Sequence, residues 1–397
     1  MEDIFKSHLY LGSASYVLLR CGNGFSARGL AELRRKTAKL PWAEDIFGGQ
    51  HNNVRLQARV STSKSKLYHT GAVESRVIAG VYEALGHDDV LPNTDLTSAI
   101  QYPSSTSSEN DPVVRLEVQV TSDQVDIWLC TSTTPLHRRG YRLETSKAPL
   151  REDLAYAMLY AAGWYPRTRE QTECHYKLLL DPMCGSGTIA IEGAAMLAGL
   201  APGRLRPPPL LGTRFQNNPL HNDLLLLATT QTTKNMVSTT ETVPMVFASD
   251  RDAGAVAATK SNAERAGVLH YMDIQQCAIS SHPLWSNGPD ADHAEQERLL
   301  VATNPPFGKR VSKAKISTTT KVAKDVQLLP LYQSLSQCVL GRRSTDAVLL
   351  AHRTDLIQRS GLKMEALFRS IHGGLSVSVS RTKENTGSFL KGGESSS

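Results

Sequence analysis

LLLDPMCGSGTIAIEGAAM, at residues 178–196, carries the clearest structural signal in the chain. Three leucines and Asp181 are typical of a buried strand that ends in an acid, and the apolar run that starts at Thr188 is typical of a helix. Between them, Gly185 and Gly187 let the backbone pass close to a ligand. A strand, a glycine turn and a helix in this order predict an open α/β sheet that binds a ligand at the carboxyl ends of its strands.

Two familiar phosphate-binding turns do not match this sequence. A Walker turn has a lysine before its Ser or Thr, whereas Thr188 follows Gly187 directly, and the third glycine of a dinucleotide fingerprint is out of register. The octapeptide DPMCGSGT instead resembles the first motif of class I methyltransferases, in which the glycines face the methionine part of the cofactor and the acid faces its amino group. An ordinary tight turn between strand and helix is the alternative.

Asp250 ends the next predicted strand, MVFASD at 245–250. An acid at this place suits hydrogen bonds to ribose hydroxyls, as in other nucleoside-binding α/β folds. A plain helix cap is the alternative interpretation of Asp250, and Asp252 is expected to cap the helix that follows.

A second motif, NPPF at 304–307, follows the apolar strand RLLVAT. Pro305 and Pro306 have fixed φ angles and no N–H, so the turn is rigid. The Asn304 side chain and the Pro305 carbonyl can both accept hydrogen bonds from an amino group, and Phe307 can stack on a base. A purely structural turn is the alternative, but the order of the two motifs favours transfer of a methyl group to an exocyclic amine.

The rest of the chain indicates two kinds of architecture. From residue 154 onward, short apolar runs alternate with helical segments, which predicts a doubly wound, mostly parallel sheet. The first 130 residues alternate differently and predict a smaller α+β module. Its expected elements are helices over 10–19 and 27–40, a strand at 54–60, a helix at 71–85, a polar loop at 103–112, and a hairpin of strands 113–120 and 125–130.

Composition permits an RNA partner without requiring one. The 397 residues are enough for two domains, the formal net charge is +6 and the pI is about 8.9. The six cysteines form no C-x-x-C pair and no zinc-ligand spacing, so no metal site is expected. The apolar run Leu224 to Ala228, like the others in the sequence, is too short to span a bilayer, and the N-terminus lacks a signal-peptide core.

Taken together, the motifs resemble the RNA methylases that carry a THUMP domain before a Rossmann-fold methyltransferase, in particular the guanine-N2 methyltransferases of ribosomal and transfer RNA. The resemblance covers nearly the whole chain, from SASYVLLRCGNGFSA and VRLQARVSTSKSKLYHTG through DPMCGSGT to TNPPFGKR. It implies a partial ferredoxin-like region at 1–50, a THUMP-like RNA-binding domain at 51–134, a basic connector at 135–153 and a class I methyltransferase domain at 154–390.

The resemblance also implies S-adenosylmethionine as cofactor, N2-methylguanosine in rRNA or tRNA as product, and a set of site residues. The target base would be held by Asn304, Pro305, Pro306 and Phe307. The cofactor would be held by Asp181, Pro182, Met183, Cys184, Gly185, Gly187, Thr188, Asp250 and Arg251. Contacts to RNA phosphates are expected from Arg138, Arg139, Arg142, Lys309 and Arg310, with solvated surface charge as the alternative.

Departures from the family pattern leave other functions open. The acid expected after the third strand is missing from DIQQCAISS at 273–281, and the N-terminus looks clipped. An RNA-binding homologue with weakened catalysis is therefore one alternative, and methylation of an adenine N6 or another amine is a second. A cytoplasmic, nuclear or nucleolar location is expected, and an organellar one stays open.

Overall fold

The computed structural model describes residues 1–48, 55–87, 113–144, 149–165, 176–236, 245–285, 297–307 and 318–383. Of the predicted features, the polar loop at 103–112 and the cations Lys309 and Arg310 lie outside these residues. The chain divides into two compact units, one of Met1–Leu136 with Arg206–Leu227 and one of His137–Leu205 with Ala228–Ser397. Among the described helices, none combines the length and apolar character that crossing a bilayer requires.

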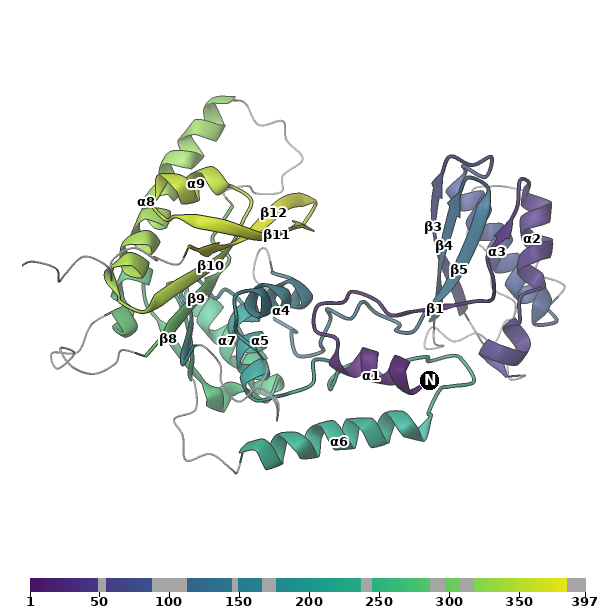
Figure 1. Cartoon of the computed structure of the whole chain (residues 1–397), viewed down its shortest axis with the longest axis horizontal. Helices are drawn as coiled ribbons and strands as arrows, with labels where there is room; N and C mark the ends of the chain where they lie inside the picture. Colours follow the sequence, from purple (N-terminus) through teal and green to yellow (C-terminus); the bar gives the residue numbers. More distant parts are fainter. Residues whose placement is uncertain are drawn as a thin grey trace, which may run out of the picture. The chain divides into compact units, whose positions relative to one another are not determined.

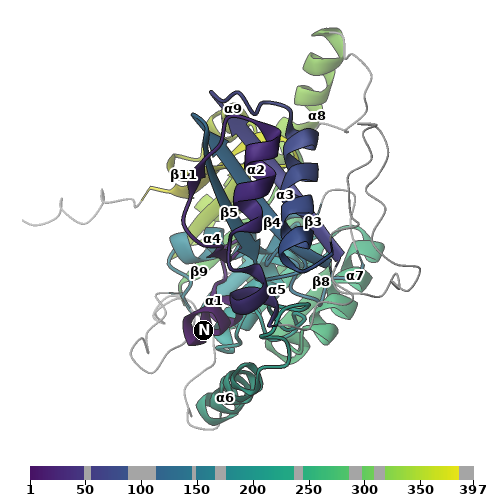
Figure 2. The same cartoon turned by 90° about the vertical axis from the view of Figure 1, so that its right-hand side faces the viewer.

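The first unit is built on a sheet with the strand order β1-β5-β4-β3, and β2 pairs with β5. Its strands are β1 (Leu18–Arg20), β2 (Phe25–Ser26), β3 (Arg55–Ser63), β4 (Val113–Thr121) and β5 (Gln124–Cys130). Its helices are α1 (Glu2–Tyr10), α2 (Leu30–Ala38), α3 (Thr70–Ala84) and a π-helix at Trp42–Phe47. Helices α2 and α3 lie side by side along the sheet (Figure 2). Gly80 permits their close approach, since a Cβ there would lie 2.7 Å from the Arg34 carbonyl oxygen.

The predicted strand at 54–60, the helix at 71–85 and the hairpin are confirmed in this unit. The hairpin turns through Ser122 and Asp123, whose positive φ angles of 51° and 64° suit the twist of the flanking strands. The helix expected over 10–19 is wrong. Helix α1 ends at Tyr10, and Leu18 pairs instead with Cys130 as part of an antiparallel strand. Pairing with a neighbouring strand decides the conformation of this short apolar segment.

The second unit holds a seven-stranded sheet with the order β11-β12-β10-β9-β6-β7-β8 (Figure 1). Its strands are β6 (Leu178–Asp181), β7 (Met245–Asp250), β8 (Met272–Gln276), β9 (Leu299–Thr303), β10 (Thr345–Ala351), β11 (Met364–His372) and β12 (Leu375–Thr382). Strands β8, β7, β6, β9 and β10 are parallel, and β12 runs antiparallel to both β10 and β11. The predicted doubly wound, mostly parallel sheet is therefore confirmed.

Helices cover both faces of this sheet because the strand side chains alternate between two apolar cores. Leu300 and Ala302 of β9 belong to the core under α4 (Glu152–Ala161), α5 (Thr188–Leu197) and α7 (Ala253–Arg265). Leu299 and Val301 belong to the opposite core under α8 (Thr318–Gly341) and α9 (Thr354–Arg359). Burial on both faces explains why these strands read as continuous apolar runs.

The segment 206–227 joins the first unit, although the sequence placed it within the methyltransferase domain at 154–390. The guanidinium of Arg206 donates to the carbonyl of His8. The backbone N–H of Leu210 donates to Thr131 at 2.7 Å, and that of Arg214 donates to Ile46 at 2.9 Å. The segment leads into α6 (Pro219–Met236). These contacts join residues far apart in the sequence, which periodicity cannot detect.

Candidate functional site

The glycine turn and the NPPF turn meet at one edge of the sheet. Strands β6 and β9 are parallel neighbours, with Leu178 opposite Leu299 and Leu180 opposite Val301. Parallel strands in register end at the same edge, so both turns lie at their carboxyl ends. A hydrogen bond joins the two ends directly, because the Thr303 hydroxyl donates to Oδ1 of Asp181 at 2.7 Å.

The glycine turn has a conformation that only glycine adopts without strain. Gly185 and Gly187 have φ angles of +57° and +85°. A Cβ on Gly187 would lie 2.7 Å from Cγ2 of Thr259, which is itself on α7. The Thr259 hydroxyl donates to the Gly185 carbonyl at 3.0 Å. Helix α7 therefore holds the turn in one shape, ahead of the N-terminus of α5.

Asp250 connects the second strand end to this turn. Its Oδ2 accepts from the backbone N–H of Gly185 at 3.1 Å, and its Oδ1 accepts from that of Asp252 at 3.0 Å. Since a carboxylate offers about four acceptor sites, lone pairs remain for the hydroxyls of a ribose. The predicted cap at Asp252 is confirmed, because its side chain accepts from Gly254 at 2.8 Å and from Ala255 at 3.2 Å.

Asp181 lies almost wholly inside the protein, at 1% exposure. Burial raises the pKa of its carboxyl group to about 7, and the nearby Asp250 charge acts in the same direction. The hydrogen bonds from Thr303 and from the Met183 backbone N–H favour the charged form and offset only part of this effect. A cation placed beside this carboxyl group would stabilise its charged form.

The remaining residues of the glycine turn are mostly buried. Pro182, Cys184 and Thr188 are buried, while Met183 is half-buried. Burial raises the pKa of the Cys184 thiol, which lies 3.5 Å from the Thr259 hydroxyl. Arg251 is exposed at the end of β7, and its carbonyl accepts from Gln276 Nε2 at 3.2 Å. The carboxyl end of β8 thus carries Gln276 and Cys277 where an acid was expected.

Asn304 carries a buried acceptor that the described residues leave unpaired. Its Oδ1 is inaccessible to water and has no hydrogen-bond partner among them. An unsatisfied buried polar atom costs about 1–3 kcal/mol, so a donor from a bound molecule would stabilise this site. Pro305 is buried, Pro306 is exposed, and Phe307 is half-buried against the core. The arrangement fits an amino group held at Asn304 beside an aromatic ring.

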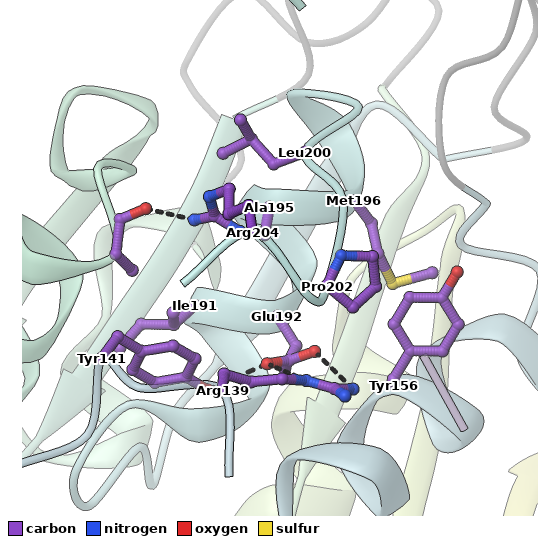
Figure 3. Close-up of a pocket in the computed structure, with 11 residues that line it drawn as sticks. Arg139, Tyr141, Tyr156, Ile191, Glu192, Ala195, Met196, Leu200, Pro202 and Arg204 are labelled. Carbon is purple, nitrogen blue, oxygen red and sulfur yellow. Dashed lines mark hydrogen bonds and ion pairs between the residues drawn. The ribbon is translucent and has the colours of Figure 1, made fainter. Parts of the chain in front are cut away.

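The predicted phosphate-binding cations divide into different environments. Arg138 is exposed, as a phosphate contact requires. Arg139 is only 2% exposed, and its guanidinium pairs with Glu192 at 3.4 Å (Figure 3). Arg142 is half-buried and pairs with Glu152 at 3.0 Å. The expected contact of Arg139 with an RNA phosphate is therefore corrected, because Glu192 neutralises its charge inside the protein. The charge of Arg142 is likewise paired, with Glu152.

His352, which follows β10, was not among the site residues predicted from the sequence. The His352 ring lies 6.2 Å from the Phe307 ring, centroid to centroid, with the planes tilted by 51°. The strand AVLLAH, ending in a polar residue at the same edge of the sheet as Asp181 and Asn304, was the available signal. Among the described residues, no group of three or more His, Cys, Asp or Glu side chains is arranged to hold a metal ion.

Residues 139–358 match the protein family described as UPF0020, RMKL-like methyltransferase domain. The chain is 27% identical over 379 residues to a ribosomal RNA large subunit methyltransferase K/L of Marinomonas sp. (strain MWYL1), which covers 94% of this chain and 46% of the relative. It is 29% identical over 377 residues to the protein of that name from Syntrophotalea carbinolica, covering 94% and 47%. The chain thus spans about half the length of these relatives.

Solved structures share the fold. The SAH complex of SMU.472 matches with a TM-score of 0.71 and 22% identity, over 96% of this chain and 87% of that chain. TrmN from Thermus thermophilus matches with a TM-score of 0.57 and 18% identity, over 92% and 82%. At these identities the likeness concerns the fold alone.

Proposed function

The chain belongs to the UPF0020 family of RMKL-like methyltransferase domains, and from this premise we propose that it is an S-adenosylmethionine-dependent RNA methyltransferase that forms N2-methylguanosine. Ribosomal RNA of the large subunit is the proposed substrate, because the curated relatives are named for methylation of that RNA. A guanine N2 is the proposed acceptor because the chain resembles guanine-N2 RNA methylases, and the NPPF turn presents acceptors suited to an amino group.

One observation carries this proposal: the hydrogen bond of 2.7 Å between Thr303 and Asp181. It joins the ends of two adjacent parallel strands, so the turn at 181–188 and the turn at 304–307 border the same space. Methyl transfer requires a cofactor and an amine in line at short range, and most of its acceleration comes from that alignment. Turns at distant edges of the sheet would be incompatible with this reaction.

The residues of the glycine turn fit S-adenosylmethionine. The open backbone at Gly185 and Gly187 would face the methionine part, the buried Asp181 would face its ammonium group, and Asp250 would accept from the ribose hydroxyls. When bound, the cofactor supplies an electrophilic methyl group on a sulfonium. Gln276 and Cys277 border the expected adenine side and offer no carboxylate, so the adenine would be held without one.

Asn304 and Pro305 are proposed to prepare the exocyclic amine of the target guanine for methylation by holding it in place. Their oxygens accept the two hydrogens of the exocyclic amine, which favours a more tetrahedral nitrogen whose lone pair points at the methyl carbon. The transferred methyl group would take the place of one amine proton, which would pass to water. Phe307 stacks on the extruded base. No strong base is needed before attack, because the proton becomes acidic only as the bond forms.

The first unit is proposed to be a THUMP-like module that binds RNA. Its loop between β3 and α3 presents Lys64, Lys66 and Tyr68, and the Tyr68 side chain is 79% exposed. Asp123 holds this loop, because its Oδ1 accepts from the Ser65 hydroxyl at 2.8 Å and from the Lys66 N–H at 2.9 Å. Exposed cations beside an exposed ring suit a nucleic-acid strand.

Asn304→Ala tests the proposed reaction. We expect kcat for methyl transfer to large-subunit rRNA to fall about a hundredfold or more, because the amine loses its acceptor and its alignment. The affinity for SAH, measured by calorimetry, should change less than about threefold. Asn222→Ala, at an exposed asparagine of α6, is the matched control.

Three results would contradict this assignment in different ways. Near-normal turnover by the Asn304→Ala protein would remove the proposed role of the NPPF turn. Failure of the unmodified chain to bind SAH at all would favour the alternative of an RNA-binding homologue without activity. The reason for considering this alternative is that the end of β8 carries no acid. Transfer to duplex DNA but not to RNA would instead indicate an adenine methylase.

A further inference from the structure

A polar groove lies between α9 and the β11–β12 hairpin, on the same unit as the candidate site (Figure 1). It encloses about 870 Å³, a volume that includes space open to solvent. Its polar lining consists of His352, Thr354, Gln358, Arg369, Ser376 and Ser378. Its apolar floor includes Ile357, Leu362 and Val377, which are buried.

His352 lies both in the groove and beside the place proposed for the target base. Phe307 and His352 lie with their rings 6.2 Å apart, and His352 also lines the groove. Nδ1 of His352 lies 2.7 Å from the carbonyl oxygen of Ser376 at the start of β12. This hydrogen bond holds the imidazole in position. A strand whose base stacks on Phe307 therefore reaches the groove within one nucleotide.

The lining is rich in hydrogen-bond donors and contains no carboxylate among the described residues. The alternation LSVSVSRT places Ser376, Ser378 and Ser380 on one face of β12 and Val377 and Val379 in the core. The hydroxyls of Ser378 and Ser380 lie 3.2 Å apart.

Arg369 provides the positive charge of the groove. It lies directly opposite Ser378 in the β11–β12 ladder and is exposed. Within the described part of the chain it makes no ion pair, whereas the nearby Asp355 is paired with Arg353 at 2.6 Å. A guanidinium without a carboxylate partner, next to hydroxyl and amide donors, matches a phosphodiester and its ribose.

We propose that this groove binds the nucleotide adjoining the target guanine in the RNA strand, with Arg369 on its phosphate and the serines and Gln358 on its ribose. The proposal rests on the proposed function. The groove thereby positions the extruded base, since a flipped nucleotide is fixed only when its neighbours along the backbone are held. Arg369 is a positioning residue, because it acts on the reacting base through the strand.

Arg369→Ala, Arg369→Lys and the matched control Arg359→Ala separate this role from a general effect of charge. Arg359 is also exposed, lies at the end of α9 and does not line the groove. Binding is measured by the anisotropy of a fluorescein-labelled single-stranded RNA of about ten nucleotides at several salt concentrations. Methyl transfer is measured on large-subunit rRNA from cells that lack the protein, and SAH affinity by calorimetry.

For Arg369→Ala we expect RNA affinity to fall about tenfold, as for a lost charged hydrogen bond. The slope of log K against log salt should decrease in magnitude by about 0.7, the value for one phosphate contact on a single strand. KM for rRNA should rise and kcat should fall because the bound base is less well aligned, while SAH affinity stays unchanged, and Arg369→Lys should restore part of the RNA affinity. Arg359→Ala should match the unmodified protein.

Equal RNA affinity and KM for the Arg369→Ala and Arg359→Ala proteins would overturn the groove proposal. A loss of SAH affinity in Arg369→Ala would also overturn it, because the side chain would then act on the cofactor. If the unmodified protein binds the RNA probe but methylates no RNA, the proposed function fails. The salt slopes of the variants then still decide whether the groove binds a strand.

Discussion

At the scale of single residues, the burial of Asp181 and its proposed contact with the cofactor favour opposite protonation states of its carboxyl group. Its burial raises the carboxyl pKa to about 7 from an ordinary value of 3.8, so the neutral form is favoured in the folded protein. The unfolded chain releases this proton at lower pH. The free energy of unfolding therefore decreases as pH rises from about 4 to about 7. The proposed contact with the cofactor needs the charged form, which this environment makes costly.

The affinity for SAH should accordingly depend on pH through Asp181. A bound ammonium group favours the carboxylate, so below pH 7 binding must release a proton. We expect the affinity to increase with pH from about 5.5 to about 7, by up to about tenfold per unit, and then to level off. This range lies below the titration of a free α-amino group. Calorimetry in buffers of different ionisation enthalpy would also count the proton released.

Asp181→Asn is the control for this dependence, because an amide oxygen can still accept from Thr303. Its SAH affinity should be lower at pH 7 and nearly independent of pH over the same range. If the Asp181→Asn protein kept the pH dependence of the original, another group would have to be responsible, and the proposed contact would be wrong.

At the scale of elements, the segment after Leu136 is fastened to α5 by buried charges. Glu192, one turn along α5 from Thr188, accepts from the Tyr141 hydroxyl at 3.0 Å and pairs with Arg139 (Figure 3). Arg142 continues the network to Glu152 and also donates to the Thr188 hydroxyl at 3.3 Å. Burial raises the pKa of Tyr141 well above its ordinary value, and the Glu192 charge adds to this effect. The network thus anchors the helix whose N-terminus borders the cofactor turn.

Removing one partner of this network should destabilise the second unit strongly. Glu192→Ala removes the carboxylate that pairs with the buried guanidinium of Arg139, and we expect a loss of about 3–5 kcal/mol in the free energy of unfolding. The double variant Arg139→Leu with Glu192→Leu removes both charges and should recover most of that loss. Denaturant titration measures both. A loss below about 1 kcal/mol for Glu192→Ala would mean that the pair is open to water.

These elements also show what can be predicted from the sequence and what cannot. The strands β6, β7 and β9 and both turns were predictable, because each is a short apolar run followed by residues with special backbone chemistry. The burial of Arg139 was not, because a cationic segment has the same composition whether its partner is a phosphate or the internal Glu192. The strand at Leu18 depended on Cys130, more than a hundred residues away.

At the scale of the whole molecule, the two units are not consecutive along the chain. In the sequence, Arg206–Leu227 lies between two parts of the second unit, but it belongs to the first unit. The three prolines at 207–209 stand at the start of this segment, but they were not interpreted as a domain border. A domain border derived from sequence assumes that each domain is one continuous stretch. That assumption does not hold here, because the hydrogen bonds of Leu210 and Arg214 attach their segment to the first unit.

Because the candidate site belongs to the second unit, a substitution in the first unit should change RNA affinity and leave cofactor affinity unchanged. Tyr68 is the most exposed large apolar side chain described in the chain, and Lys66 flanks it. Because stacking on one base contributes about 1–3 kcal/mol, we expect Tyr68→Ala to weaken binding of large-subunit rRNA by at least about fivefold. Its SAH affinity and melting temperature should stay unchanged, since the ring packs little. Tyr10→Ala, at the 44% exposed end of α1, is the matched control. RNA affinities equal to that control would exclude the loop between β3 and α3 from the RNA-binding surface.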